Sequence, residues 1–223
     1  MIIDTHFHLD FLPDPTPFKS APIIAQTLTP TAYLAQPHIP RHALGLHPWY
    51  ASLDELPAFA AAVDSTKFIG EVGLDYRFPH QEAFRRLVDL TVSSSRTHVM
   101  SIHAVRSVTA VLDILDEFDP CRTQITPIIH WFTGTSDELT RHIRAGGFIS
   151  VNPRMLETKR GRAYVTQVPA DRLLVETDLP REAGETLTPE DHAAIIQGTV
   201  DKLSELRGED MTARIEETQR EIL

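Results

Sequence analysis

The chain has 223 residues, enough for one sizeable domain or two small ones. Hydrophobic residues make up 42% of it and charged residues 23%, which is ordinary globular composition and excludes wholesale disorder. The formal net charge of −10 makes it a poor candidate for coating duplex DNA by bulk charge, although a local, cation-loaded site for nucleic acid remains possible.

The sequence contains no signal for export or membrane insertion. No stretch approaches about 18 consecutive apolar residues, so no membrane span is expected. The first residues lack a basic segment followed by an apolar one, so no secretion signal is expected. Cys121 is the single cysteine and cannot form an internal disulfide, which suggests a reducing compartment. These features predict a cytoplasmic protein.

Short apolar runs recur along the chain. Most of them lack alternation of polar and apolar residues, which is typical of parallel strands covered on both faces. The predicted strands are residues 2–5, 23–27, 43–46, 67–72, 99–103, 126–131, 147–151 and 172–176.

The segments between these runs are mostly helical in pattern. Residues 10–21 hold three prolines, so the first crossover is expected to be a loop. After Pro79 the apolar residues follow helical spacing. Thr135 and Glu138 predict a capping box, and Thr188 an N-cap, of two later helices. Eight strands with mostly helical crossovers predict one α/β domain over 1–223, a TIM-type (β/α)8 barrel. A doubly wound open sheet is the alternative, but no G-x-G-x-x-G motif or P-loop supports it.

Histidines and carboxylates fall where the predicted strands end. An H-x-H pair alone is weak evidence, but residues two apart on a strand face the same way. In a barrel the carboxyl ends of the strands form the face where active sites are built. Buried together without a cation, these groups would leave unpaired polar atoms. The candidates for a metal site are His6, His8, Glu71, His103, His130 and Asp178.

This set of nitrogen and oxygen ligands is too large for one tetrahedral ion. It suits two divalent ions that share a bridging carboxylate and keep open positions. Some barrel hydrolases bridge two ions with a carboxylated lysine, and here Glu71 is the candidate for that place.

Several motifs together resemble the TatD family of metal-dependent nucleases. They are Asp-Thr-His-Phe-His-Leu-Asp at 4–10, Gly-Leu-His-Pro at 45–48, Gly-Glu-Val-Gly-Leu-Asp-Tyr at 70–76, His-Trp-Phe-Thr-Gly at 130–134 and Glu-Thr-Asp-Leu-Pro at 176–180. The resemblance implies a barrel of the amidohydrolase kind and hydrolysis of phosphodiester bonds in DNA or RNA. It also implies 3′-to-5′ action on single strands with two divalent ions such as Mg, Mn or Zn.

Carried over residue by residue, the resemblance assigns His6, His8 and Asp178 to one ion and His103 and His130 to the other, with Glu71 between them. The segments 150–156 and 159–162 further resemble the TatD-type nuclease of Qat anti-phage defence systems. That resemblance implies a role in antiviral defence and partner proteins of the defence system.

Roles in catalysis follow from this assignment. We expect Asp178 to accept the proton of the attacking water, and Glu71 to be essential for catalysis. His47, at the end of the third run, either contacts the substrate phosphate or orients a ligand. Asp75 either supports a ligand or caps the loop after the fourth strand.

Other polar and aromatic residues are expected in the loops that follow the strands. Arg154, Lys159 and Arg160, with Arg162, are expected in the loop after the seventh strand, where they could bind substrate phosphates. Bases could stack on Trp49, Tyr76, Trp131 and Phe132, and further cations in such loops are Arg77, Arg106 and Arg181. The remaining histidines, 38, 42, 80, 98, 142 and 192, are expected at the surface, and Cys121 is given no catalytic role.

Two other functions are consistent with the same residues. The ions could polarise a carbonyl in an esterase or amidohydrolase, such as a D-aminoacyl-tRNA deacylase. The barrel could instead be a non-catalytic subunit that binds nucleic acid or partner proteins, although the full ligand set speaks against this.

Overall fold

The computed structural model describes residues 1–36, 39–78 and 80–223. Its eight strands all lie at the predicted apolar runs, with ends that shift by a few residues. They are β1 (Asp4–Phe7), β2 (Ile23–Ala25), β3 (Ala43–Leu46), β4 (Phe68–Asp75), β5 (His98–Val105), β6 (Ile125–His130), β7 (Phe148–Val151) and β8 (Leu173–Val175).

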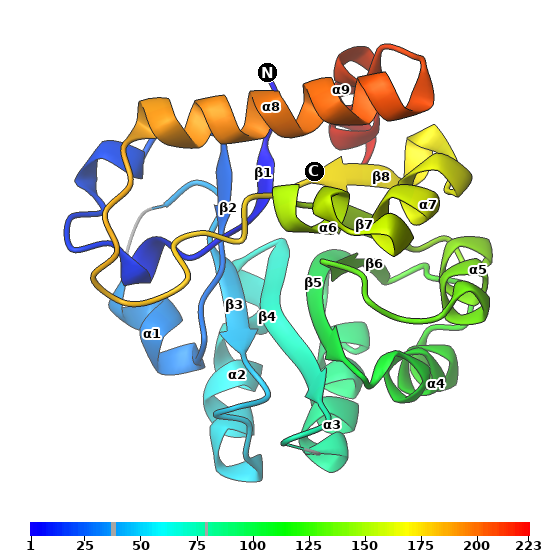
Figure 1. The fold of residues 1–223 in the computed structure, drawn as a ribbon. Helices are drawn as coiled ribbons and strands as arrows, with labels where there is room; N and C mark the ends of the chain where they lie inside the picture. The colour runs from blue at the N-terminus through cyan, green and yellow to red at the C-terminus, as the bar shows by residue number, and fades with distance from the viewer. Residues whose placement is uncertain (37–38, 79) are drawn as a thin grey trace.

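The strands form a closed ring in chain order. Strands β3 to β8 make one parallel sheet, and β1 pairs with β2 in parallel. Two isolated parallel bridges join these pieces, Ala25 with His42 and Phe7 with Leu179. The Asp178 N–H also donates to the His6 carbonyl over 3.0 Å. The ring confirms the predicted TIM-type barrel (Figure 1).

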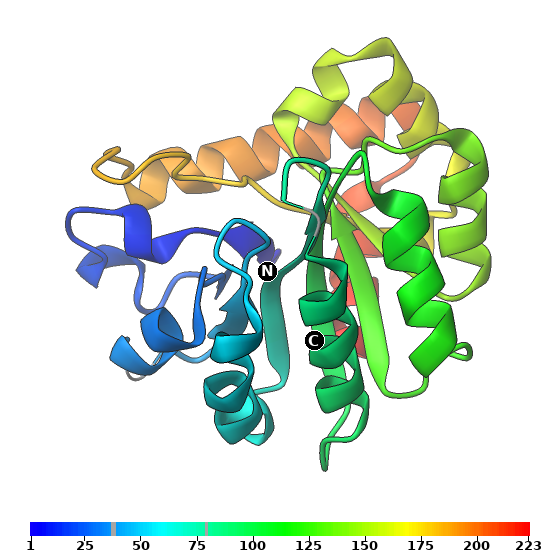
Figure 2. The ribbon, with the colours of Figure 1, turned by 90° about the horizontal axis from the view of Figure 1, so that it is seen from below.

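Helices lie outside the strands, as the view at right angles shows for the green part of the chain (Figure 2). The predicted helices after β4, β5, β6 and β8 are confirmed, as are the Thr135–Glu138 capping box and the Thr188 N-cap. None of the described helices is long and apolar enough to cross a membrane. The helices are α1 (Pro30–Ala35), α2 (Leu56–Ala62), α3 (Gln81–Val92), α4 (Val108–Phe118), α5 (Ser136–Arg144), α6 (Pro153–Glu157), α7 (Lys159–Gln167), α8 (Pro189–Arg207) and α9 (Met211–Ile222).

The first crossover has no α-helix, as its prolines predicted. Between β1 and β2 the chain makes only two short 3₁₀ turns, Leu9–Phe11 and Thr16–Phe18. The segment after β7, in contrast, is helical where a loop was expected. Asn152 caps α6 by accepting from the Met155 N–H, and Thr158 caps α7 by accepting from the Gly161 N–H. These two caps start short helices in a stretch too brief to show helical periodicity.

Apolar side chains fill one end of the barrel. One buried cluster takes a residue from each strand or from its edge, which makes it a layer inside the ring. Its members are Ile3, Ile24, Ala43, Phe68, Val99, Ile128, Phe148 and Leu174. A larger cluster lies between the strands and the surrounding helices. The interior layer leaves the opposite end, where the strands finish, for polar side chains.

Glu71 and His103 lie inside their strands, although the apolar runs placed them at strand ends. Both strands continue past the apolar runs, to Asp75 and Val105, and β4 also has an irregularity, a register shift against β5 between Ile69 and Val72. Gly70 and Gly73 flank Glu71 with φ values of +153° and +138°. A Cβ at Gly73 would lie 2.1 Å from the His103 carbonyl oxygen, so only glycine allows β4 and β5 to pair at this point.

Candidate metal centre

A pocket of about 350 Å³ opens at the carboxyl ends of the strands. Predicted site residues from five different strands or their following loops line it, namely His8, Glu71, His103, His130 and Asp178. His6 lies directly behind them, with Nε2 3.3 Å from Nε2 of His8. The structure therefore brings together all six residues that the sequence proposed as a metal site.

Glu71 lies at the centre of this cluster, and its two carboxylate oxygens face different neighbours. Oε2 lies 3.5 Å from His6 Nε2 and 3.6 Å from His8 Nε2. Asp178 Oδ1 is 3.7 Å and 3.4 Å from the same two nitrogens. The first group of side chains is therefore His6, His8 and Asp178 around one oxygen of Glu71.

The other oxygen of Glu71 faces a second group of imidazoles. Oε1 lies 2.7 Å from His103 Nδ1, 3.1 Å from His130 Nε2 and 3.4 Å from His47 Nε2. Burial raises the pKa of Glu71, but the charge interaction with His47 and the hydrogen bonds with His103, His130 and His47 outweigh burial and hold that pKa well below its usual range. An ionised carboxylate with one oxygen in each group can bridge two cations.

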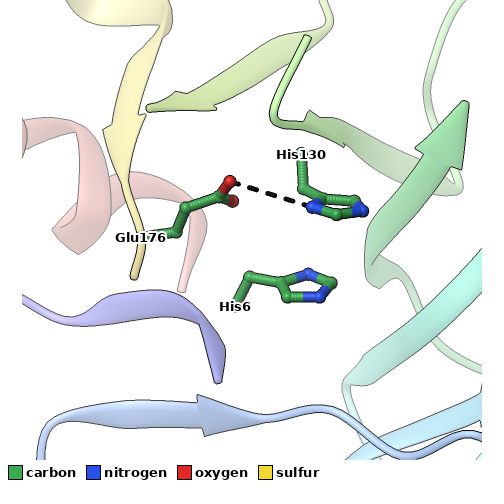
Figure 3. Close-up of side chains that lie close together, drawn as sticks. All are labelled: His6, His130 and Glu176. Carbon is green, nitrogen blue, oxygen red and sulfur yellow. Dashed lines mark ion pairs between the residues drawn. The ribbon is translucent and has the colours of Figure 1, made fainter. Parts of the chain in front are cut away.

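Most of these imidazoles are oriented by a second polar group on the far side of the ring. His6 Nδ1 lies 2.8 Å from Ser101 Oγ, and His103 Nε2 lies 3.3 Å from Asp75 Oδ2. His130 Nδ1 lies 3.8 Å from Glu176 Oε1 (Figure 3). Such partners fix the tautomer of a histidine and direct its other nitrogen at a metal.

Glu176 was not identified from the sequence, although its position next to His6 and His130 makes those three residues a possible metal-binding group. Its oxygens already accept hydrogen bonds from the Trp131 N–H at 3.0 Å, from Asn152 Nδ2 at 3.0 Å and from Ser150 Oγ. These hydrogen bonds hold Glu176 in place, and its 3.8 Å separation from His130 Nδ1 is an ion-pair distance without a hydrogen bond. Its sequence signal is its place two residues before Asp178 at the end of β8.

Asp4 is a second residue whose role the sequence did not reveal. Its Oδ1 accepts from the backbone N–H groups of His6 at 3.0 Å and Thr177 at 3.1 Å. Its Oδ2 accepts from Thr177 Oγ1 at 2.6 Å and lies 2.8 Å from His192 Nε2 on α8. Asp4 is fully buried, so these bonds hold the end of β1, the segment after β8 and α8 together.

His47 differs from the other imidazoles in its hydrogen bonding. The Trp49 N–H donates to His47 Nδ1 over 3.2 Å, which uses the lone pair of that nitrogen. A neutral His47 therefore carries its proton on Nε2, the nitrogen that faces Glu71. An N–H group binds a carboxylate or phosphate oxygen and repels a cation. The structure places this nitrogen 3.4 Å from Glu71 Oε1, where the N–H group can orient that carboxylate, and the alternative contact with a substrate phosphate stays a prediction.

Comparisons with known proteins agree with the fold. The family model described as TatD related DNase matches residues 3–222. The chain belongs to this family. A protein of Pectobacterium carotovorum named 3'-5' ssDNA/RNA exonuclease TatD is 27% identical over 186 residues, 75% of this chain and 70% of that one. The protein of the same name from Escherichia coli K12 is 26% identical over 187 residues, 74% and 70% of the two chains.

Solved structures show the same fold. The TatD homologue YJJV of Escherichia coli K12 superposes with a TM-score of 0.77 at 23% identity, covering 98% of this chain and 95% of that one. An uncharacterized amidohydrolase from Saccharomyces cerevisiae gives 0.72 at 14% identity, covering 100% and 99%. As a member of the TatD-related DNase family, the protein is a metal-dependent hydrolase, and its His and carboxylate groups can hold metal.

In this TatD-family barrel the loop after β4 is tied to the site through Asp75. The buried carboxylate accepts from Arg77 Nε and Nη2 and from the Arg77 N–H, and it contacts His103 as well. Burial raises the pKa of Asp75, but the hydrogen bonds from Arg77, Trp49 and His103 outweigh burial and hold it well below its usual range. Asp75 thus fulfils both expectations, as a support for His103 and as the cap of this loop.

Only some of the expected substrate-binding cations lie near the TatD pocket. Arg154 stacks over Trp131, which lines the pocket, with Cζ 5.4 Å from the ring centroid. Lys159 and Arg160 are exposed on α7 and do not line it. Arg162 donates to the carbonyl oxygens of Leu156 and Glu157, and Arg181 lines the pocket.

Two surface expectations were wrong. Phe132 is 2% exposed and packs on Tyr164 in the core, so it cannot stack on a base. Histidines 42, 98, 142 and 192 are buried because each has a partner inside the fold, which spacing along the chain does not reveal. Their partners are the Tyr33 ring, Ser94, the Phe148 carbonyl and Asp4. His80 is exposed as expected, and His38 lies outside the described residues.

His142 makes the TatD barrel sensitive to acid. Burial lowers its pKa to about 4, below the value of about 6.5 in an unfolded chain. Because the unfolded chain binds the proton first, stability is retained above pH 6.5 and lost as pH falls toward 4. At pH 5 the loss from this group amounts to about 2 kcal/mol. Urea denaturation at pH 7 and pH 5 gives the free energy of unfolding at each pH. We expect the difference between these two free energies to be smaller for His142→Gln than for the unmodified protein. The exposed control His80→Gln should show the same difference as the unmodified protein. An equal change in the free energy of unfolding between the two pH values in all three proteins would contradict the assignment to His142.

Proposed function

We propose that this TatD-family protein is a nuclease that hydrolyses phosphodiester bonds in DNA or RNA, from the 3′ ends of single strands, with two divalent ions. The observation that carries the proposal is the placement of Glu71, whose oxygens each face a separate group of side chains. The relatives named 3'-5' ssDNA/RNA exonuclease support the choice of substrate and polarity.

The donor groups suit two such ions. His6, His8 and Asp178 would hold the first, His103 and His130 the second, and Glu71 would contact both. Ser101 and Asp75 fix the rings of His6 and His103 so that one nitrogen of each stays directed at Glu71. The number of imidazoles favours a transition metal over magnesium. We expect one barrel over residues 1–223 to carry the whole site.

When bound, such ions acidify a water and offset charge on phosphate oxygens. Asp178 has an ionised carboxylate at the pocket, because contacts with His8, His130 and His6 outweigh burial and lower its pKa. It can therefore accept the proton of the attacking water. His47 can donate its Nε2–H to a phosphate oxygen. The pocket has the volume of a small-molecule site, which admits a terminal nucleotide and excludes a duplex.

The test is a digestion panel with labelled single- and double-stranded DNA and RNA, carried out with Mg, Mn or Zn and again with a chelator. We expect metal-dependent release of nucleotides from single strands, lost with the chelator and restored by the metal. Release of an amino acid from aminoacyl-tRNA without release of nucleotides would favour a deacylase. Metal-loaded protein that binds nucleic acid without turnover would favour a binding subunit.

Cleavage should favour single strands over duplex DNA. An acidic body with few cations near the pocket cannot neutralise the phosphates of a long duplex. We expect frayed or single-stranded 3′ ends to be shortened at least about tenfold faster than blunt ends, a difference of about 1.4 kcal/mol. End-labelled substrates of identical sequence measure the two rates, and equal cutting in the middle of a blunt duplex would contradict the proposal.

Arg154, Lys159 and Arg160 are proposed to hold substrate phosphates outside the pocket. Arg154 is closest, because it stacks on Trp131 at the pocket. We expect Arg154→Ala and the double variant Lys159→Ala/Arg160→Ala to raise KM for oligonucleotides, with the larger rise for Arg154→Ala. The slope of log affinity against log salt concentration should fall in magnitude by about one for each phosphate contact removed. Hydrolysis of bis-p-nitrophenyl phosphate should not change. Unaltered oligonucleotide kinetics in both variants would remove these residues from the substrate path.

A role in antiviral defence, with partner proteins, is proposed from the likeness of residues 150–156 and 159–162, with 130–132, to the Qat-associated nuclease. Cells that carry the defence genes with unmodified or Glu71→Gln protein would be challenged with phage. The role is supported if cells with the unmodified protein are protected from phage and cells with Glu71→Gln protein are not. Plaque counts that are equal in cells with and without the gene for this protein would reject it.

A further inference from the structure

Four side chains form a row of alternating arginine and aromatic groups, which we call the arginine–aromatic ladder: Trp49, Arg77, Tyr76 and Arg106. Arg77 Cζ lies 5.1 Å from the centroid of the Trp49 ring and 5.9 Å from that of Tyr76. Arg106 Cζ lies 4.8 Å from the Tyr76 centroid. Trp49 is 48% exposed and Tyr76 50%, so both rings leave much of their surface to solvent.

The ladder leads away from the active-site pocket. Trp49 lines that pocket and packs edge-on against His47, with ring centroids 5.0 Å apart. At the other end, Tyr76 and Arg106 line a second surface hollow together with residues of α3 and α4. The four residues come from the segments that follow β3, β4 and β5, which are neighbours in the sheet. The row is therefore continuous from the pocket to this hollow.

The two arginines differ in their partners. Asp75 accepts from Arg77 Nε and Nη2, which holds the guanidinium in place between Trp49 and Tyr76. Nη1 of Arg77 remains available for a ligand, and its side chain is 47% exposed. Arg106 forms no ion pair with any residue that the structure describes. On a chain of net charge −10, Arg106 thus offers an exposed guanidinium beside an aromatic ring, as Arg154 does beside Trp131.

We propose that the ladder binds the part of a single-stranded nucleic acid that lies just outside the pocket, an inference that rests on the proposed nuclease function. A base packs against the exposed part of the Tyr76 ring, and phosphates contact Arg106 and Nη1 of Arg77. Flat rings that alternate with guanidinium groups match a chain in which flat bases alternate with phosphates. A duplex cannot use the row, because its bases are already stacked on each other. The ladder therefore adds affinity for unpaired strands without reading their sequence.

The test uses variants at the outer end of the ladder, Tyr76→Ala and Arg106→Ala, which lie away from the metal centre. Tyr76→Phe keeps the ring, and Arg214→Ala removes an exposed arginine from α9 as a matched control. The substrates are single-stranded DNAs from a dinucleotide to about ten nucleotides. We expect kcat/KM on the long strand to fall about tenfold in both alanine variants, the usual effect of losing one stacked base. Tyr76→Phe and Arg214→Ala should match the unmodified protein, and so should all variants on the dinucleotide.

A binding measurement separates this proposal from the nuclease proposal. Fluorescence anisotropy with a labelled phosphorothioate strand of about ten nucleotides, which resists hydrolysis, reports the Kd of the metal-loaded protein. A tenfold rise of this Kd in Tyr76→Ala and Arg106→Ala supports the ladder even if no substrate is cleaved. In Arg106→Ala the Kd should also depend less steeply on salt concentration. Unchanged Kd in both variants, or equal loss on the dinucleotide and the long strand, would overturn it.

Discussion

Glu71→Gln is expected to lower hydrolysis of every substrate by more than about a hundredfold, the loss already typical of residues that only support a metal site. The amide is neutral and offers one acceptor oxygen, whereas the carboxylate of Glu71 places an oxygen in each group of imidazoles. The side chain keeps its size, and the glycines that shape β4 remain, so the fold should survive.

Three measurements make this result specific. The kcat/KM values for single-stranded DNA and for bis-p-nitrophenyl phosphate should fall together, because both substrates need the metal centre. Metal content per chain should also fall, while the thermal unfolding midpoint stays close to that of the metal-free unmodified protein. The exposed variant Glu82→Gln on α3 serves as the control for loss of a carboxylate. Turnover near the unmodified level in Glu71→Gln would refute the assignment of Glu71 as the bridging group.

Asp178→Asn is expected to lower kcat by about a thousandfold with little change in KM, the range for loss of a general base. The carboxylate of Asp178 faces the pocket and lies 3.4 Å from His8 Nε2, and an amide in its place cannot accept a proton. The substrate contacts proposed at His47 and along the rim are left intact, which is why binding should persist.

Comparison of kcat with KM separates catalysis from binding in this variant. Asp171→Asn, an exposed residue of the turn before β8, is the matched control. A large rise in KM with kcat unchanged would show that Asp178 binds substrate and is not the base. If metal content falls as far as in Glu71→Gln, Asp178 acts mainly as a ligand.

The cluster of metal-type residues could be predicted because barrel topology converts position along the chain into position in space. Residues near the ends of parallel strands must meet on one face, so His6, His130 and Asp178 were placed correctly without knowledge of any contact. Glu71 and His103 were placed in the right pocket but at the wrong points of their strands. The irregularity in β4 depends on how it pairs with β5, which apolar runs do not report.

The supporting residues could not be found in the same way. Asp4, Glu176 and His192 act through hydrogen bonds across the barrel to residues far away in sequence. A histidine with a buried partner looks the same in a sequence as one on the surface, which is why four buried histidines were expected outside. The caps at Asn152 and Thr158 were visible as residue types, but helices as short as α6 give no periodicity to confirm them.

The bonds that join Asp4 to Thr177 and His192 have a consequence for the way the protein is made. They connect residues 173 and 188 positions apart, so the histidines at the end of β1 stay without their partners during most of synthesis. A growing chain on the ribosome can carry His6 and His8 but cannot yet place Asp178 beside them. Ordering so long a loop costs entropy that only the finished contacts offset. The catalytic centre therefore assembles late, after β8 and α8 have emerged, and an unfinished copy has no means of degrading the nucleic acids that surround it.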